Sequence, residues 1–476
     1  MPKNILIFAD GTGQVGGVRP DQQLSNIYKM FRATRGGPDS PIDPRDQMAF
    51  YDPGIGTTNT SGSVSLGLWE RIRSIASQAV GLEFSRNVID CYEAILKRYE
   101  PGDRIYLFGF SRGAYTVRAL ANVLNLCGVP TLDGHGKPLP RTGRRLRAIA
   151  DEAVRRVYEH GAGHPRKRFQ DQREELARRF RRKYGAGQGE DRADVFPEFV
   201  GVFDSVAALG MPISTRVMIV AGGLLALCGL GWAIGRWAHV WDPWQAGLGL
   251  ALAGGVLMVW MFAVATVRWA PKGLSTGGQF HFAFWRGENY DRFLDARIPI
   301  VRHALAIDET RKHFGRVEWG GKANNDLLTG ERLRLHQRWF AGNHSDIGGS
   351  YPEDESRLSD IALGWMLTEA TIGPNPIIVD QSKLNRYPDP LGAQHSEVFA
   401  AQQGPWWRRL LPWPMLHRTI HPEADLDLSV IARFEASSVL DCDAATPYRP
   451  ESLRDHRDTK QFYRDDAVCS KGDDNV

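Results

Sequence analysis

The sequence predicts an α/β fold, with a mostly parallel sheet and helices on its faces. Short uncharged apolar runs, typical of buried strands, alternate with longer segments whose apolar residues recur every three to four positions, typical of helices. Strands that alternate with helices in this way form parallel βαβ units. The functional side chains of such a sheet are expected in the turns after the carboxyl ends of its strands.

The N-terminal part of the chain supplies three strands and two helices. Residues 4–9, 48–51 and 104–108 are short apolar runs that are each followed by a turn. Apolar residues at helical spacing cover about 80–99 and 114–126. Ser111 therefore lies between a predicted strand and a predicted helix.

The middle of the chain departs from this pattern twice. Residues 141–183 hold fifteen Arg and Lys against six Asp and Glu, and we interpret them as a basic helical insertion. After a strand-like run at 198–204, residues 217–235 and 245–267 carry no charge. Each is long enough to cross about 30 Å of hydrocarbon at 1.5 Å per residue. The two runs predict a transmembrane hairpin, with a buried helical hairpin of a soluble enzyme as the alternative.

The soluble pattern resumes after the hairpin with strand-like residues near 302–307 and 338–341 and an amphipathic helix at about 359–369. Residues 404–418 are rich in Trp, Pro and Arg, and within them we expect residues 406–413 to touch a membrane interface. We divide the chain into the N-terminal half of the sheet domain (1–140), the basic insertion (141–194), a strand and turn of the sheet domain (195–215), the hairpin (216–268), the C-terminal half of the sheet domain (269–465) and a disordered tail (466–476).

The composition excludes several classes of protein. The five cysteines show no C-x-x-C spacing, so neither a disulfide framework nor a zinc site is expected. No cleaved signal peptide is expected, because the first residues lead straight into an apolar strand-like run. The basic segment shows no aromatic interleaving and no recognised nucleic-acid-binding module, and we expect no nucleic-acid partner. Next to a membrane hairpin, it is instead suited to face anionic lipid headgroups.

The turn Gly-Phe-Ser-Arg-Gly around Ser111 is typical of a nucleophilic serine. A serine hydroxyl needs a base to accept its proton and a carboxylate to orient that base. The chain offers Asp204 at a strand end and His344 in a glycine-rich turn, in the order found in α/β-hydrolases. His303 is an alternative base, and Asp346 or Asp308 are alternative acids.

Acyl transfer also requires donors for a developing oxyanion, and the amide of Arg112 and the turn at Gly11 and Thr12 are the candidates. A different interpretation groups Asp10, His344 and Asp346 as ligands of a hard metal ion, although no spacing rule supports it. We expect no cofactor and no metal.

Six stretches of the chain resemble an α/β-hydrolase family of bacterial and fungal proteins, whose best understood members are phospholipase effectors of type VI secretion. The stretches are FADGT (8–12), YDPGIGT (51–57), GDRIYLFGFSRGAYTVR (102–118), GVFDSV (201–206), RHALAIDE (302–309) and WFAGNHSDIGG (339–349). The resemblance implies an α/β-hydrolase fold and a triad of Ser111, Asp204 and His344. It implies an esterase or phospholipase acting on lipid-like esters.

These observations predict a membrane-anchored serine hydrolase that cleaves carboxylic esters, with phospholipid acyl chains as the expected substrate. The catalytic part is expected on the cytoplasmic side, because more basic residues flank the domain end of the hairpin than its loop. The partners are then the lipid and the membrane, and the oligomeric state is open. The alternatives are a membrane-tethered interaction protein on the same fold and a metal-dependent hydrolase.

Overall fold

The computed structural model describes most of the 476-residue chain. The ranges described are 2–11, 23–54, 82–187, 193–206, 213–238, 243–274, 279–285, 292–317, 319, 326–327, 333–403, 414–442 and 444–463. Thr12, the tryptophan-rich residues 404–413 and the predicted tail at 466–476 lie outside these ranges.

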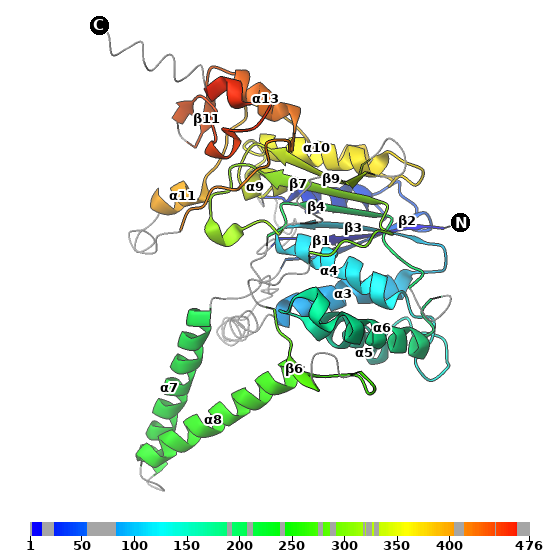
Figure 1. The fold of residues 1–476 in the computed structure, drawn as a ribbon, viewed down its shortest axis with the longest axis vertical. Coiled ribbons are helices and arrows are strands. Elements are labelled where there is room, and N and C mark those ends of the chain that lie inside the picture. The colour runs from blue at the N-terminus through cyan, green and yellow to red at the C-terminus, as the bar shows by residue number, and fades with distance from the viewer. Residues whose placement is uncertain are drawn as a thin grey trace.

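A parallel sheet forms the centre of the molecule (Figure 1). Its strands run in the order β2-β1-β3-β4-β7-β9-β10, and every pair along this path is parallel. The short strand β8 (Asp326–Leu327) pairs antiparallel with β9. The prediction of a mostly parallel sheet is confirmed. The strands on the path are β1 (Asn4–Ala9), β2 (Gln47–Asp52), β3 (Arg104–Phe110), β4 (Phe199–Phe203), β7 (Ile300–Ala306), β9 (Leu333–Phe340) and β10 (Asp425–Leu426).

Helices cover both faces of the sheet. Successive side chains of a strand point to opposite faces, so each strand contributes to the apolar cluster on either side. In β1, Ile5 and Ile7 belong to one apolar cluster and Leu6 and Phe8 to the other. The first cluster lies under α3 (Leu82–Arg98) and α4 (Arg112–Cys127) together with α5 (Arg144–Asp151) and α6 (Gln170–Tyr184), and the second under α1 (Asn26–Thr34) and α10 (Arg357–Thr371).

The basic segment contributes to the core as well as to the surface. Leu146, Val154 and Phe180 are buried in the cluster beneath α3 and α4. Among its basic residues, Arg147 forms ion pairs with Asp90 and Glu93 of α3. Its connecting turns are one π-helix and two 3-10 helices: Glu152–Val157, Tyr158–Gly161 and Arg166–Phe169.

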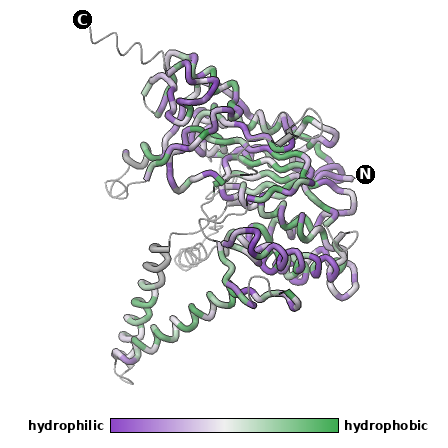
Figure 2. Tube along the Cα trace, viewed as in Figure 1, coloured by the Kyte–Doolittle hydropathy of each residue, from purple (hydrophilic) through white to green (hydrophobic). Residues whose placement is uncertain are grey.

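Two long helices, α7 (Ile213–Ala238) and α8 (Pro243–Thr266), project from this body (Figure 1). Their described residues are mostly hydrophobic, in contrast to α5 and α6 (Figure 2). The helices pack closely where glycines meet, because a Cβ on Gly231 would lie 2.6 Å from the carbonyl oxygen of Ala246.

Two membrane-spanning helices were predicted, and the described structure contains one candidate. Within the described residues, only Trp244–Thr266 of α8 forms a helix long and apolar enough to cross a membrane. The window that defines it is not buried within the protein. The first predicted crossing includes residues 217–220, whose side chains lie outside the described part of the structure.

The C-terminal residues add a small third cluster beside β9 and β10. Its members include Trp339, Val430 and Phe434. The elements outside the main sheet are β5 (Val267–Trp269), β6 (Phe280–Phe282), α9 (His344–Gly348), α11 (Glu397–Gln403), α13 (Leu428–Glu435), β11 (Val439–Asp441), β12 (Ala444–Thr446) and the 3-10 turns Lys312–Phe314, Gln381–Lys383 and Glu451–Leu453.

Candidate active site

Ser111 occupies a sharp turn between β3 and α4. Its backbone has φ 58° and ψ −122°, a region that a non-glycine residue rarely adopts. Both glycines of the motif are required by close packing. A Cβ on Gly113 would lie 2.1 Å from the carbonyl oxygen of Ala9, and one on Gly109 would lie 2.5 Å from the carbonyl oxygen of Gly113. The turn has the strained strand-to-helix geometry of a nucleophile elbow.

Parallel pairing brings the predicted site residues to one edge of the sheet. Phe110 at the end of β3 pairs with Phe203 at the end of β4, and the amide of Ser111 donates a hydrogen bond to the carbonyl of Phe203 at 3.1 Å. Asp204 follows directly and also has a positive φ, of 38°. His344 comes four residues after the end of β9 and begins α9.

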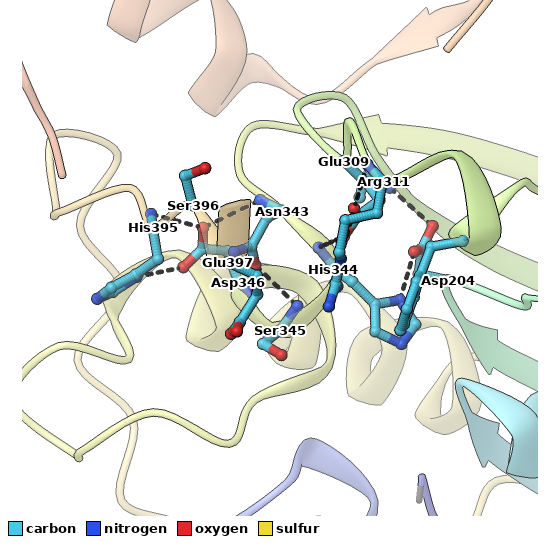
Figure 3. Close-up of polar contacts among 12 residues, drawn as sticks. Asp204, Glu309, Arg311, Asn343, His344, Ser345, Asp346, His395, Ser396 and Glu397 are labelled. Atoms are coloured by element: carbon cyan, nitrogen blue, oxygen red, sulfur yellow. Dashed lines mark hydrogen bonds and ion pairs between the residues drawn. The ribbon is translucent and has the colours of Figure 1, made fainter. Parts of the chain in front are cut away.

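Asp204 and His344 form a buried pair. Nδ1 of the imidazole lies 2.6 Å from Oδ2 of the carboxylate (Figure 3). The ring of Phe110 stacks on the imidazole at 4.7 Å, and Phe314 meets it edge-on at 5.2 Å. A proton on Nδ1, shared with Asp204, leaves the lone pair on Nε2 available as a base.

Nε2 of His344 is buried and makes no hydrogen bond within the described residues, to the Ser111 hydroxyl or to any other group. An unpaired buried polar atom is costly, and it marks a position that a reacting group is suited to fill. Catalytic hydrogen bonds of this kind often form only when substrate is bound.

Arg418, which no sequence pattern indicated, also holds Asp204 and shares the Oδ2 atom of that carboxylate with His344. Its Nη2 donates to Oδ2 of Asp204 at 2.9 Å, and its Nη1 donates to Oδ1 at 2.5 Å. The same guanidinium donates to the carbonyls of Ala306 and Phe314 at 2.9 and 3.0 Å. Burial alone would raise the pKa of Asp204, but the charge of Arg418 and the bond to His344 outweigh it and hold the pKa well below its usual range. Asp204 is therefore ionised.

Of the candidate oxyanion donors, the turn at Gly11 lies close to Ser111, but the amide of Gly11 already has an acceptor. A Cβ on Gly11 would lie 3.3 Å from the Cβ of Ser111, so the turn after β1 does reach the nucleophile. The amide of Gly11, however, donates to Oδ1 of its neighbour Asp10 at 2.7 Å. Arg112 begins α4, whose N-terminal dipole favours negative charge at Ser111.

His303, the alternative base, is fully buried in β7. Its Nε2 accepts a hydrogen bond from the amide of Ser205 at 3.2 Å, and its ring meets Trp319 edge-on. Burial, together with the nearby charge of Arg118, holds its pKa well below the usual value. A neutral histidine bonded to a backbone amide fits a structural role.

The alternative acids contact other groups. Asp346 lies 2.7 Å from Nδ1 of His395, on the other side of α9 from Asp204 (Figure 3). Asp308 accepts bonds from the amide of Gly342 and from the hydroxyl of Tyr448, and burial raises its pKa to about 7.

The metal interpretation requires Asp10, His344 and Asp346 to converge. Asp10 instead accepts hydrogen bonds from Ser25 and Tyr51, and burial raises its pKa to about 6. No group of three or more His, Cys, Asp or Glu side chains among the described residues is arranged to hold a metal ion.

Residues 3–369 match the model of the family described as T6SS, Phospholipase effector Tle1-like, catalytic domain. The chain belongs to this family. The match covers Ser111, Asp204 and His344 and ends before Arg418, so a segment beyond it completes the surroundings of Asp204.

An uncharacterized protein of Saccharomyces cerevisiae, YEL023C, is 23% identical over 418 residues. The alignment covers 77% of this chain and 57% of the yeast protein. A crystal structure of an uncharacterized protein from Pseudomonas aeruginosa aligns with a TM-score of 0.36 and 16% identity, over 81% of this chain and 47% of that one. The chain therefore spans about half the length of these relatives.

Proposed function

We propose that this Tle1-like chain is a serine esterase that cleaves acyl esters of phospholipids. The observation that carries the proposal is the buried pair of His344 and Asp204, whose free Nε2 lies at the sheet edge that also bears the strained turn of Ser111. A serine hydrolase needs an ionised carboxylate, a neutral imidazole and a serine on a strained turn, and in α/β-hydrolases they follow in the chain order serine, acid, histidine.

In the proposed mechanism, Nε2 of His344 accepts the hydroxyl proton of Ser111 as Oγ attacks the ester carbonyl carbon. The imidazolium is stabilised by Asp204, and the oxyanion is stabilised at the N-terminus of α4. The C–O bond of the ester then breaks, and His344 returns the proton to the leaving alcohol. In the second half of the reaction, the same nitrogen takes a proton from water as its oxygen attacks the acyl carbon. The bond between that carbon and Oγ of Ser111 then breaks, His344 returns the proton to Oγ, and the fatty acid is released.

Attachment to a membrane through α8 is the second part of the proposal. The span of 23 residues is predominantly apolar and carries no charge, and its most apolar window is not buried, so it would expose a large hydrophobic surface in water. α8 ends at Thr266, and β7 of the same sheet as Asp204 follows, so the attached segment is an insertion within the catalytic domain. The enzyme would then work on lipid at the bilayer surface, with the catalytic domain proposed to be cytoplasmic.

The triad is tested with Ser111→Ala and the matched control Ser345→Ala, which removes a hydroxyl next to His344. Ser111→Ala should abolish both ester hydrolysis and labelling by a fluorophosphonate probe, a loss of at least about 10³-fold in kcat. Ser345→Ala should retain both. Fluorophosphonate labelling of folded Ser111→Ala would contradict the assignment. A wild-type protein that is not labelled would favour a non-catalytic interaction protein.

The membrane role is tested by replacing residues 216–266 with a short flexible linker. Hydrolysis of a soluble short-chain ester should stay within about tenfold, because the segment supplies no proposed catalytic group. Hydrolysis of phospholipid in vesicles should fall much further, since the local concentration at the bilayer is lost. Equal loss on both substrates in a folded variant would mean that the segment is part of the catalytic fold.

A further inference from the structure

A two-stranded antiparallel hairpin begins directly after α8. It consists of β5 and β6, with Trp269 opposite Phe280 and Val267 opposite Phe282. β6 lies where α8 joins the body of the protein (Figure 1).

The alternation of side chains in this hairpin is the reverse of the usual one. Phe280 and Phe282 are 55% and 45% exposed, whereas His281 between them is 7% exposed. A strand at a protein surface ordinarily buries its apolar side chains and exposes its polar ones. Trp269 is 68% exposed, and its ring lies 5.6 Å from that of Phe280. The outer face is therefore aromatic.

The exposed face is continuous with the apolar helix. Phe262, in the last turns of α8, is 43% exposed, and its ring stacks on Phe282 at 6.5 Å. We call these four residues the aromatic strip: Phe262, Trp269, Phe280 and Phe282. The strip extends from the end of the candidate membrane span onto the hairpin.

The inner face of the hairpin is fixed to the catalytic domain. His281 stacks on Phe169 at 3.8 Å, and its Nε2 lies 2.6 Å from the carbonyl oxygen of His160. Just beyond β6, the ring of Trp285 packs edge-on against Phe84 and against Tyr115 of α4. Because α4 begins after Ser111, the strip and the candidate nucleophile belong to one packed unit.

Basic residues lie near the Trp269 end of the strip. Lys272 comes three positions after Trp269, and Arg179 of α6 donates to the carbonyl of Lys272 at 2.9 Å. Arg268 lies opposite His281 and so belongs to the inner face of the hairpin. Aromatic rings with Lys and Arg beside them, at the end of an apolar helix, are typical of the boundary between hydrocarbon and headgroups. This combination favours an anionic lipid surface over a second copy of the chain.

We propose that the aromatic strip is a membrane-interface anchor, with Trp269, Phe280 and Phe282 inserted among the lipid headgroups where α8 leaves the bilayer. This inference rests on the proposed attachment through α8 and adds a second contact to it. Attachment through the helical segment alone leaves the catalytic domain free to tilt, whereas the strip fixes the height and orientation of α4 above the lipid.

The test is differential tryptophan quenching in nanodiscs of phosphatidylglycerol and phosphatidylcholine whose chains are brominated near the carbonyl end. Full-length wild type is compared with Trp269→Phe, which keeps an aromatic ring and the fold, and with Trp260→Phe as the reference for α8. The difference in emission between wild type and Trp269→Phe reports Trp269, and the difference between wild type and Trp260→Phe reports Trp260. Brominated lipid should lower each of these two differences at least twofold.

The outcomes separate this inference from the membrane proposal. Quenching of Trp260 without quenching of Trp269 would overturn the anchor and leave the attachment through α8 intact. Quenching of neither residue would overturn both. If brominated lipid does not quench Trp269 but the emission wavelength of Trp269 changes with protein concentration, the strip contacts a second copy of the chain instead of lipid. Phe280→Ser with Phe282→Ser should abolish quenching of Trp269, whereas Phe399→Ser, an exposed phenylalanine on α11, should not.

Discussion

Two histidine–carboxylate pairs include residues of the short helix α9. They differ in the contacts made by Nε2, the ring nitrogen that faces away from the acid. His344 and His395 each hold a carboxylate through Nδ1, at 2.6 and 2.7 Å. Nε2 of His344 is buried without a partner in the described structure, whereas Nε2 of His395 lies 3.3 Å from Glu355. Only the first histidine has a nitrogen that a substrate or nucleophile can use.

The two acids are also held differently. Asp204 is bonded by the guanidinium of Arg418, while Asp346 accepts the backbone amides of Asn343 and His395. Tyr351 stacks on the ring of His395 at 3.8 Å and closes that pair. The pair of Asp346 and His395 therefore clamps the turn that carries His344. A histidine next to an aspartate is not by itself a catalytic signature, because its second nitrogen decides what it can do.

The largest effect expected from this comparison is on catalysis. His344→Gln should lower kcat for a soluble ester by about 10⁴-fold or more, because the only proposed base is lost. His395→Gln, the matched substitution in the other pair, should lower it by less than about tenfold. Steady-state kinetics with thermal melts of both variants measure the difference. Similar losses in two folded variants would mean that the comparison is wrong.

A smaller effect is expected on the pH profile when Arg418 is changed. His344 can accept a proton in the proposed mechanism only when its imidazole is neutral. The positive charge of Arg418, which is bound to Asp204, opposes a second positive charge on that imidazole, so its removal should favour the protonated, inactive form. Arg418→Met should move the acid limb of kcat/KM upward by about one pH unit. Glu309 and Arg311, which lie beside His344, stay unchanged.

Arg418→Lys is the matched control for that measurement. It keeps the charge but loses the two-pronged contact, so its acid limb should stay close to that of wild type while its stability falls. An unchanged acid limb in Arg418→Met would show that the arginine only supports packing.

The smallest effect is on stability. Burial lowers the pKa of His395, but its bonds to Asp346 and Glu355 outweigh this and raise the pKa in the folded state. The pair therefore stabilises the fold fully at a pH below the pKa of histidine in the unfolded chain, about 6.5, and this stabilisation is lost as the pH rises through the pKa of His395 in the folded state. His395→Gln should lower the free energy of unfolding by about 1 kcal/mol at pH 6 and by less at pH 9. Denaturant titrations at the two pH values measure it, and a loss that grows with pH would contradict the pairing.

Much of the sheet and its functional edge could be predicted from the sequence. Each strand is a local apolar run with a turn after it, so β1, β3 and β4 and the residues that follow them were identified from neighbouring positions alone. The candidate triad followed because the carboxyl ends of parallel strands lie at one edge. The assignment of its members to an acyl-transfer mechanism stays a prediction.

The contacts that the sequence did not reveal are those between distant segments. Arg418 lies 214 positions from Asp204, in a stretch without periodicity, so no local pattern links them. His395 is likewise distant from Asp346 and follows an irregular loop. The contribution of the basic segment to the core could not be predicted, because its buried residues Leu146, Val154 and Phe180 are separated by many charged residues.

The insertion of α7 and α8 between β4 and β7 also orders the synthesis of the protein. A ribosome makes Ser111 and Asp204 first, then both long helices, and only later His344, which lies 140 positions after Asp204. Arg418 follows still later. The nascent chain thus has no histidine at position 344 until its apolar helices have been made, so the proposed triad cannot assemble before the segment that we propose to attach it to a membrane exists.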